Sequence, residues 1–273
     1  MTNTIWRYIT YMVMCRKAPL KRFRFSPHLV HPGGNTPPMW TDTMTDLRPF
    51  ASLGAANHGW LDAHHHFSFS DYHDPARMGW GSIRVWNDDV IAAGSGFPPH
   101  GHRDMEIITY VRSGAITHQD SLGNKGRTGA GDVQVMSAGT GVQHSEWNAE
   151  GAATTLFQIW IEPRSAGGAP RWDMKPFPRD DRSVGWQLLA SGFGEPDALV
   201  IGADARIFGA VVKAGASVTH VVDDGRHGYL VPALGTVEVN GTQVNARDGL
   251  ALSAGTFDIR AVDDSELVLV DAP

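Results

Sequence analysis

Two pairs of side chains in the first half of the sequence have the types and the spacing of metal ligands. His100 and His102 lie two residues apart, and His144 and Glu146 repeat that spacing. In a β-strand, residues i and i+2 point to the same face, so each pair can present both side chains to one point. Three imidazoles and one carboxylate around a common centre suit a divalent transition metal, and they leave positions open for water, dioxygen or a substrate.

The ligand types leave the identity of the metal open. Imidazole and carboxylate accept iron, manganese, cobalt, nickel, copper or zinc. A single cysteine, Cys15, excludes a cysteine-rich zinc site and any intramolecular disulfide. The chain is therefore expected in a reducing cytoplasm. One His-x-His pair alone would be a weak signal, because histidines also serve as hydrogen-bonded core residues, and the second pair strengthens it.

The elements that must position these residues are predicted to be short antiparallel strands. Glycine is frequent, at 31 residues, and turn signals recur from Ile83 onward. Residues 237–244 alternate apolar and polar side chains around Asn240-Gly241, which predicts a hairpin with a type I′ turn. No long amphipathic helix is indicated.

An internal repeat predicts a duplicated fold. Residues 131–140 resemble residues 248–256, and each segment is an expected strand that runs into a Ser-Ala-Gly-Thr turn. We expect an all-β protein of two antiparallel β-barrels, the first over residues 44–165 and the second over residues 166–273. The Pro- and Gly-rich passage over residues 163–178 is the expected joint.

The second copy serves as an internal control for the metal site. His144 and Glu146 follow Thr140 by four and six residues, whereas the same offsets after Thr256 reach Arg260 and Val262. The repeated scaffold therefore does not need the histidines and the carboxylate. The second barrel is predicted to be metal-free.

The first 43 residues differ from the remainder. They carry a formal charge of +5 within a total of −6, which leaves −11 on the rest of the chain. This acidic body argues against direct nucleic-acid binding. The segment is expected to be a disordered or misassigned extension, with Met44 as the natural start; a cationic targeting arm is the alternative. No run approaches the roughly 20 apolar residues of a membrane span, so no membrane association is expected.

Several motifs resemble the two cupin motifs and, more narrowly, the pirin family with its bacterial quercetinase-like members. The cupin pattern places Gly94, His100, His102 and Glu106 in one motif and Gly131, Gly139, His144 and Asn148 in the other. The pirin-like segments are Ala56–Asp62, Phe67–Phe69, Val85–Asp89, Thr117–Asn124 and Ser137–Glu146. The resemblance extends from about Pro49 to the C-terminus and implies a bicupin of the double-stranded β-helix, or jelly-roll, type.

The resemblance also implies a function. In pirins the carboxylate ligand comes from the position of Glu146, whereas in general cupins it comes from the position of Glu106. Glu106 is then expected to be a hydrogen-bonded neighbour of the ligands. Bacterial pirins of this type open quercetin or a related flavonol with dioxygen, and carbon monoxide is released. For this chain the resemblance implies iron(II) as the first choice of metal and Glu146 as the catalytic base. The alternative is a metal- or redox-dependent regulatory protein that binds a protein partner without turnover.

Other histidines allow further roles. His118 with Asp120 could orient a substrate hydroxyl, or could form a hydrogen bond at a hairpin end. His64, His65 and His66 with His73 could suggest a second metal site. Because consecutive residues in a strand point to opposite faces, a loop or surface position is favoured for that cluster.

Overall fold

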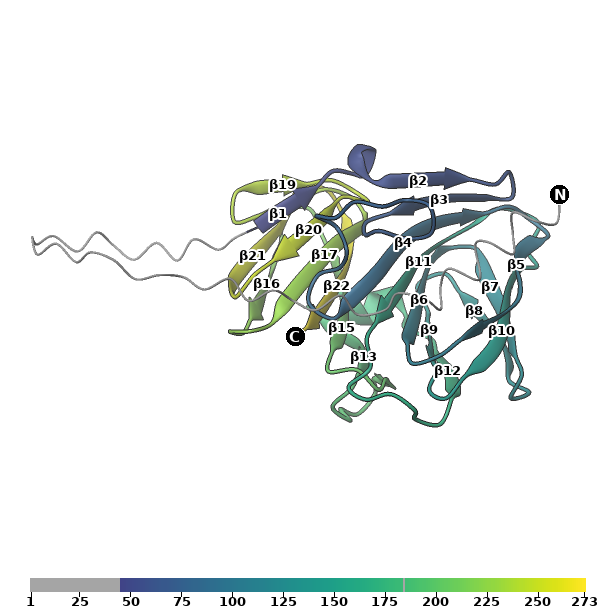
Figure 1. The fold of residues 1–273 in the computed structure, drawn as a ribbon. Coiled ribbons are helices and arrows are strands. Elements are labelled where there is room, and N and C mark those ends of the chain that lie inside the picture. Colours follow the sequence, from purple (N-terminus) through teal and green to yellow (C-terminus); the bar gives the residue numbers. More distant parts are fainter. Residues whose placement is uncertain (1–44, 184) are drawn as a thin grey trace, which may run out of the picture.

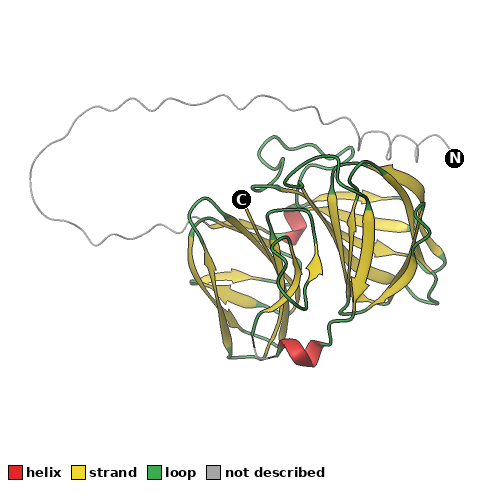
Figure 2. Ribbon diagram, turned by 90° about the horizontal axis from the view of Figure 1, so that it is seen from below, coloured by secondary structure: helices red, strands yellow, loops and turns green. Residues whose placement is uncertain are grey.

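Two β-barrels lie side by side in the computed structural model, which describes residues 45–183 and 185–273 (Figure 1). Each barrel combines a seven-stranded sheet with a four-stranded sheet. The helices of the described residues are two short 3-10 turns, η2 (Phe50–Ser52) and η3 (Arg179–Arg182), drawn in red in Figure 2. The predicted all-β bicupin is confirmed. The expectation for residues 1–43 falls outside the described part of the chain.

The first barrel contains the predicted ligand pairs. Its large sheet has the order β12 (Arg171–Lys175), β9 (Val133–Ser137), β6 (Glu106–Ser113), β11 (Thr154–Ile161), β4 (Ile83–Ile91), β3 (Leu61–His65) and β2 (Gly54–Asn57). Its small sheet has the order β5 (Ser95–His102), β10 (Val142–Asn148), β7 (Ala115–Asp120) and β8 (Lys125–Gly129). All of these neighbouring strands pair antiparallel.

The second barrel repeats this arrangement. Its large sheet has the order β1 (Thr45–Arg48), β20 (Gly249–Leu252), β17 (His227–Leu234), β22 (Ser265–Ala272), β15 (Arg206–Val212), β13 (Gln187–Ser191) and β14 (Leu199–Val200). Its small sheet has the order β16 (Ser217–Val222), β21 (Gly255–Ala261), β18 (Val237–Val239) and β19 (Thr242–Val244). The strands β9 and β20, which precede the two Ser-Ala-Gly-Thr turns, occupy the same place in the two sheets, as expected for a duplication.

The predicted hairpin over residues 237–244 is present. β18 and β19 pair antiparallel, with Val239 opposite Thr242. Asn240 and Gly241 connect the two strands, and both have positive φ angles, of 46° and 87°. This is the backbone of the type I′ turn that the Asn-Gly sequence favours.

Two strands cross the predicted boundary between the barrels. β1 pairs with β20, so the first strand of the described chain completes the sheet of the second barrel (Figure 1). β12 pairs with β9, so the first barrel takes an edge strand from beyond residue 165. The barrels therefore exchange edge strands, and the sequence ranges 44–165 and 166–273 do not describe them completely.

The large sheets of the two barrels pack against each other through a shared apolar core. Ile108 and Tyr110 of β6 contribute to this core from the first barrel, and Tyr229 and Val268 contribute from the second. The alternate residues of β6, such as Ile107, belong instead to an apolar cluster inside the first barrel. Since successive side chains of a strand point to opposite faces, each residue of β6 faces either the partner barrel or the interior of its own.

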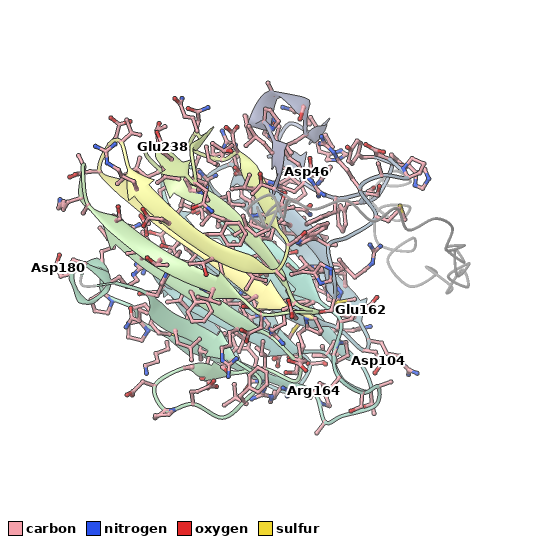
Figure 3. The ribbon with its side chains drawn as sticks, turned by 90° about the vertical axis from the view of Figure 1, so that its left-hand side faces the viewer. Asp46, Asp104, Glu162, Arg164, Asp180 and Glu238 are labelled. Atoms are coloured by element: carbon pink, nitrogen blue, oxygen red, sulfur yellow. The ribbon has the colours of Figure 1, made fainter. Side chains whose placement is uncertain are left out.

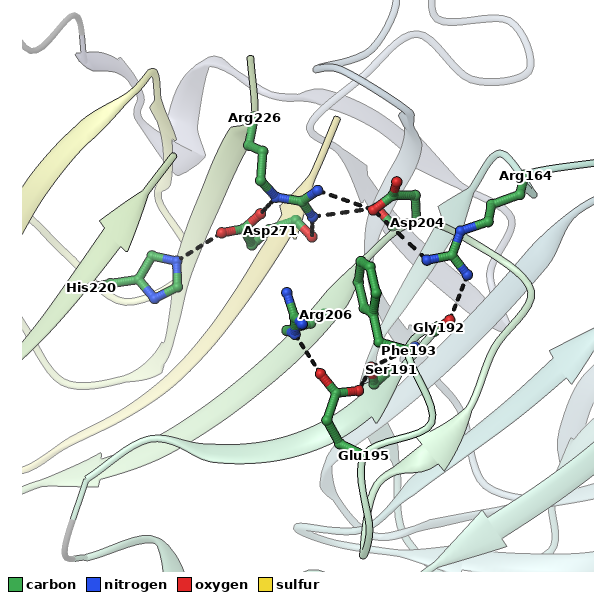
Figure 4. A network of polar contacts seen from close by, with 10 residues as sticks. All are labelled: Arg164, Ser191, Gly192, Phe193, Glu195, Asp204, Arg206, His220, Arg226 and Asp271. Carbon is green, nitrogen blue, oxygen red and sulfur yellow. Dashed lines mark hydrogen bonds and ion pairs between the residues drawn. The ribbon is translucent and has the colours of Figure 1, made fainter. Parts of the chain in front are cut away.

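A network of ion pairs in the second barrel reaches one arginine of the first barrel. Arg164, just after β11, and Arg226 of the second barrel both lie near the Asp204 carboxylate, at 3.9 and 3.0 Å (Figure 4). Arg226 also pairs with Asp271, which accepts a hydrogen bond from His220. Of these contacts, the Arg164–Asp204 pair joins the two barrels, and the others order the loops of the second barrel around it.

Charged side chains cover the outer surface, as Asp46, Asp180 and Glu238 show in Figure 3. Across residues 45–183 and 185–273, no helix has the length and apolar character of a membrane crossing.

Candidate metal centre

The two predicted ligand pairs lie on neighbouring strands of the small sheet of the first barrel. β5 carries His100 and His102, β10 carries His144 and Glu146, and the antiparallel register sets His144 opposite His100. The three histidines are buried, and each offers a ring nitrogen within 4.8 Å of the other two. Within the described residues, this is the group of histidine, cysteine and acidic side chains that could hold a metal ion.

The hydrogen bonds of these histidines leave nitrogens free to act as ligands. Nδ1 of His100 lies 2.8 Å from the carbonyl oxygen of Pro98, which can only accept a hydrogen bond. That contact places the proton on Nδ1 and the lone pair on Nε2. Nε2 of His144 is buried without a hydrogen-bond partner in the described structure. An unpartnered buried imidazole nitrogen costs free energy unless something occupies it, and a metal ion fits that requirement.

Burial keeps these histidines neutral. It lowers the pKa of His100, lowers the pKa of His102 to about 3, and lowers the pKa of His144 well below its ordinary value. The neighbouring imidazoles act in the same direction for His102 and His144. Three neutral imidazoles are the state that binds a metal.

Glu146 follows His144 by two residues on β10 and is not part of the 4.8 Å group of histidines. The register of β10 on β5 shifts between His144 and Glu146, which marks a β-bulge. The Glu146 carboxylate accepts hydrogen bonds from Gln134 at 2.8 Å, from Gln158 at 2.7 Å and from Thr109 at 3.3 Å. Burial nevertheless raises the pKa of Glu146 to about 7, because these bonds offset only part of the cost of burying its charge.

Glu106, the alternative carboxylate, is not brought to the histidines. Its carboxylate accepts a hydrogen bond from the Ser137 hydroxyl at 2.7 Å and lies against Gly202 of the second barrel. Glu106 has the strand parity of Ile108, which faces the partner barrel, whereas Thr109 faces the interior and reaches Glu146. The expectation that Glu106 neighbours the ligands is therefore corrected, because the pleat of β6 turns it to the opposite face.

His118 and Asp120 lie directly behind His144. Nδ1 of His118 is 3.4 Å from Nδ1 of His144, and Nε2 of His118 is 3.1 Å from the Asp120 carboxylate. The two side chains are 1% and 0% exposed, so neither presents a surface to a substrate in this conformation. Burial acts to raise the pKa of Asp120, but hydrogen bonds from Asn124, His118 and Leu122 outweigh it and lower that pKa.

The histidine run at residues 64–66 lies in and just after strand β3, not in a surface loop. His65 and His66 are buried. His65 contacts the Asn87 side chain at 2.8 Å, and His66 contacts the Tyr229 hydroxyl of the second barrel at 2.9 Å. The sequence did not reveal these partners, because both contacts depend on long-range packing.

Several residues of the site escaped prediction. Gln134 and Gln158 lie within apolar strands and point inward, where they bind Glu146. Asp89 is a further buried carboxyl of the first barrel; burial raises its pKa well above the ordinary range, and the charges of Asp88 and Glu146 add to this effect. For Gln134 and Gln158 the available signal was a glutamine flanked by apolar residues in a strand, whereas Asp89 follows two other polar residues of β4.

The fold and the site together define a class: a two-barrel cupin with a cluster of three histidines inside its first barrel. Comparison with known proteins agrees with this class. Residues 47–161 match the family model described as Pirin, and residues 188–272 match the one described as the quercetinase C-terminal cupin domain. The chain belongs to the pirin family.

Several relatives of this chain match it over almost their whole length. A pirin-like protein of Caulobacter vibrioides is 62% identical over 231 residues, which are 84% of this chain and 100% of that protein. The quercetin 2,3-dioxygenase of Escherichia coli is 41% identical and is covered to 99%, with 84% of this chain. A crystal structure of the Escherichia coli pirin YhhW in complex with nickel(II) superposes with a TM-score of 0.80 at 41% identity, covering 84% of this chain and 99% of that one.

Proposed function

We propose that this protein is a metal-dependent dioxygenase that opens the ring of quercetin or a related flavonol. The observation that carries the proposal is the convergence of three buried neutral imidazoles, one of which has an unpartnered nitrogen. Relatives named quercetin 2,3-dioxygenase support the choice of substrate. The nickel(II) complex of a relative supports a divalent metal, and we take iron(II) as the first candidate in this chain.

His100, His102 and His144 would hold the metal, and Glu146 would complete the ligand set. When bound, the metal supplies a Lewis-acid centre at which a substrate oxygen and dioxygen can meet. The rings of Trp160 and His102 pack nearly perpendicular to each other, with 5.0 Å between their centroids, which restrains the His102 imidazole. This packing would help to hold His102 in place as a ligand.

Glu146 would act as the base on the flavonol hydroxyl. In the metal-free protein burial raises its pKa to about 7, so the surroundings favour uptake of a proton by this carboxylate. Gln134 and Gln158 hold the two carboxylate oxygens, so the group stays in place as its proton is exchanged. Deprotonation of the hydroxyl makes the substrate electron-rich enough to react with dioxygen.

Apolar side chains beside the histidines suit an aromatic substrate. Trp160 belongs to the apolar cluster inside the first barrel, and the partly buried Phe69, Met105 and Trp172 pack against that cluster. Binding sites for aromatic ligands combine such surfaces with a few polar groups that set orientation.

The proposal is tested by turnover. Protein loaded with iron(II) under anaerobic conditions is mixed with quercetin in aerated buffer, and dissolved dioxygen and released carbon monoxide are measured. We expect equimolar consumption and release, and neither with a flavone that lacks the 3-hydroxyl group or with the His144→Ala variant. Repeating the assay with manganese, cobalt, nickel, copper and zinc, together with metal analysis of protein from its own host, identifies the working ion. Metal-replete protein that consumes no dioxygen with any flavonol would refute the proposal.

A further inference from the structure

A chain of hydrogen bonds runs from the interior of the first barrel to its surface turn. In the register of β10 on β7, His144 lies opposite Asp120 and Glu146 lies opposite His118. Nδ1 of His144 meets Nδ1 of His118 at 3.4 Å, and Nε2 of His118 meets Asp120 at 3.1 Å. The remaining nitrogen of His144, Nε2, is buried and has no hydrogen-bond partner in the described structure.

The partners of Asp120 determine where the protons of this chain reside. One carboxylate oxygen accepts hydrogen bonds from the backbone N–H groups of Leu122 and Asn124, at 2.9 and 3.0 Å. The other accepts one from the Asn124 side-chain amide at 2.9 Å. All three of these groups are donors, so Asp120 serves as an acceptor, and His118 donates to it from Nε2.

The same direction of hydrogen-bond donation continues from His118 back to His144 of the cluster of three histidines. A neutral His118 with its proton on Nε2 has a lone pair on Nδ1 and accepts a hydrogen bond from His144 Nδ1–H. His144 then carries no proton on Nε2, and the lone pair there is available to a metal. A hydrogen bond on the far nitrogen is the usual means by which a ligating imidazole is fixed in tautomer and ring orientation.

Packing holds His118 in this arrangement. The Trp172 ring stacks on the His118 ring with centroids 4.7 Å apart and planes 7° apart. Trp172 lies on β12, the strand supplied from beyond the predicted barrel boundary. Gly126 leaves room for it, since a Cβ at that position would lie 2.2 Å from the Trp172 ring.

We propose that His118 and Asp120 are positioning residues that hold His144 in the tautomer with its proton on Nδ1, and so prepare its Nε2 to bind the metal. This inference rests on the metal site of the proposed function. In this role the two residues orient the ligand His144 through hydrogen bonds and do not contact a substrate.

The Asp120→Asn variant tests the proposal because it reverses one hydrogen bond. The oxygen that accepts from two backbone N–H groups must remain an oxygen, so the new amide nitrogen faces His118. An NH₂ group there donates to Nε2 of His118, whose proton moves to Nδ1 and pushes that of His144 onto Nε2. The Asn124 side chain can turn its own oxygen toward the new amide.

Two readouts follow, and both are independent of oxygen consumption. The ¹⁵N shifts of the histidine rings in the metal-free protein report the tautomer, and competition with a chelator reports zinc affinity. We expect His144 to change from the Nδ1–H to the Nε2–H form, and zinc binding to weaken about 10- to 100-fold. A protein without dioxygenase activity could still give both results, so failure of the proposed function can be distinguished from failure of this inference.

A matched control exists in the second barrel. His220 donates to the Asp271 carboxylate from Nε2 at 3.2 Å, in the second barrel and away from the cluster of three histidines. The Asp271→Asn variant is expected to lower stability and to leave zinc affinity unchanged. Should Asp120→Asn fail to fold, the wild-type spectrum decides: a neutral His144 with its proton on Nε2 would overturn the proposal. An unaltered tautomer and zinc affinity in folded Asp120→Asn would overturn it equally.

Discussion

The participation of Glu146 in metal binding can be measured through its protonation. Metal ligation requires a deprotonated carboxylate, and burial raises the pKa of Glu146 in the metal-free protein to about 7. Burial lowers the pKa of His102 to about 3 and shifts the pKa values of His100 and His144 in the same direction, so the neutral, metal-binding form of each is favoured. If Glu146 is a ligand, each metal ion bound below pH 7 displaces one proton, and that proton comes from Glu146.

The expected magnitude follows from this one proton. Below pH 7 the affinity should rise about tenfold per pH unit, and above pH 7 it should level off. Between pH 6 and pH 8 the net gain is about tenfold, or about 1.4 kcal/mol. Metal affinity must rise with pH, because raising the pH produces the deprotonated carboxylate, which is the form that binds a metal.

Zinc titrations in competition with a chromophoric chelator, at pH 6, 7 and 8, provide the assay. The Glu146→Gln variant should bind more weakly at pH 8 and show a flat profile, because an amide does not titrate in this range. Its new NH₂ group faces the amides of Gln134 and Gln158, so urea unfolding is measured in parallel to separate loss of fold from loss of ligand. A flat wild-type profile, or an equal slope in the variant, would refute the assignment of Glu146 as a ligand.

Three further predictions concern the packing of the barrels and the binding of the metal. Tyr110→Phe removes the buried hydroxyl that accepts a hydrogen bond from Arg182 at 2.8 Å. Urea denaturation should show that the free energy of unfolding falls by about 2 kcal/mol, and zinc affinity should be unchanged. Weaker zinc binding would contradict this prediction. Gly126→Val displaces Trp172, so it should weaken zinc binding beyond what its change in Tm accounts for. Metal at a hundredfold excess over its Kd should stabilise the chelator-treated protein by about 2.7 kcal/mol in calorimetry, and the His144→Ala variant should lose most of that gain.

Local patterns predicted the features that depend on neighbours in sequence. The two-residue spacing within each ligand pair depends only on the pleat of a strand, and the structure places His100 opposite His144 accordingly. The Asn240-Gly241 turn follows from backbone preferences at two positions. The repeat of the Ser-Ala-Gly-Thr turn indicated a duplicated scaffold, which both family matches bear out.

Features set by long-range packing were beyond local reasoning. Glu106 shares the parity of His102 in sequence, but the turn between β5 and β6 resets the pleat, and Glu106 faces Gly202 of the second barrel. The hydrogen bond from His66 to Tyr229 likewise joins the two barrels. Neither partner could be identified from residues nearby in sequence, because each pairing depends on how two folded sheets meet.

The exchange of edge strands has a consequence for how the protein folds during its synthesis. β1 leaves the ribosome before every other described strand, yet its partner β20 is among the last to be made, with Thr45 opposite Leu252. The closing of so long a loop is entropically costly and slow. The second barrel takes an edge strand from the opposite end of the described chain, so we expect its sheet to be completed only after both halves have been synthesised.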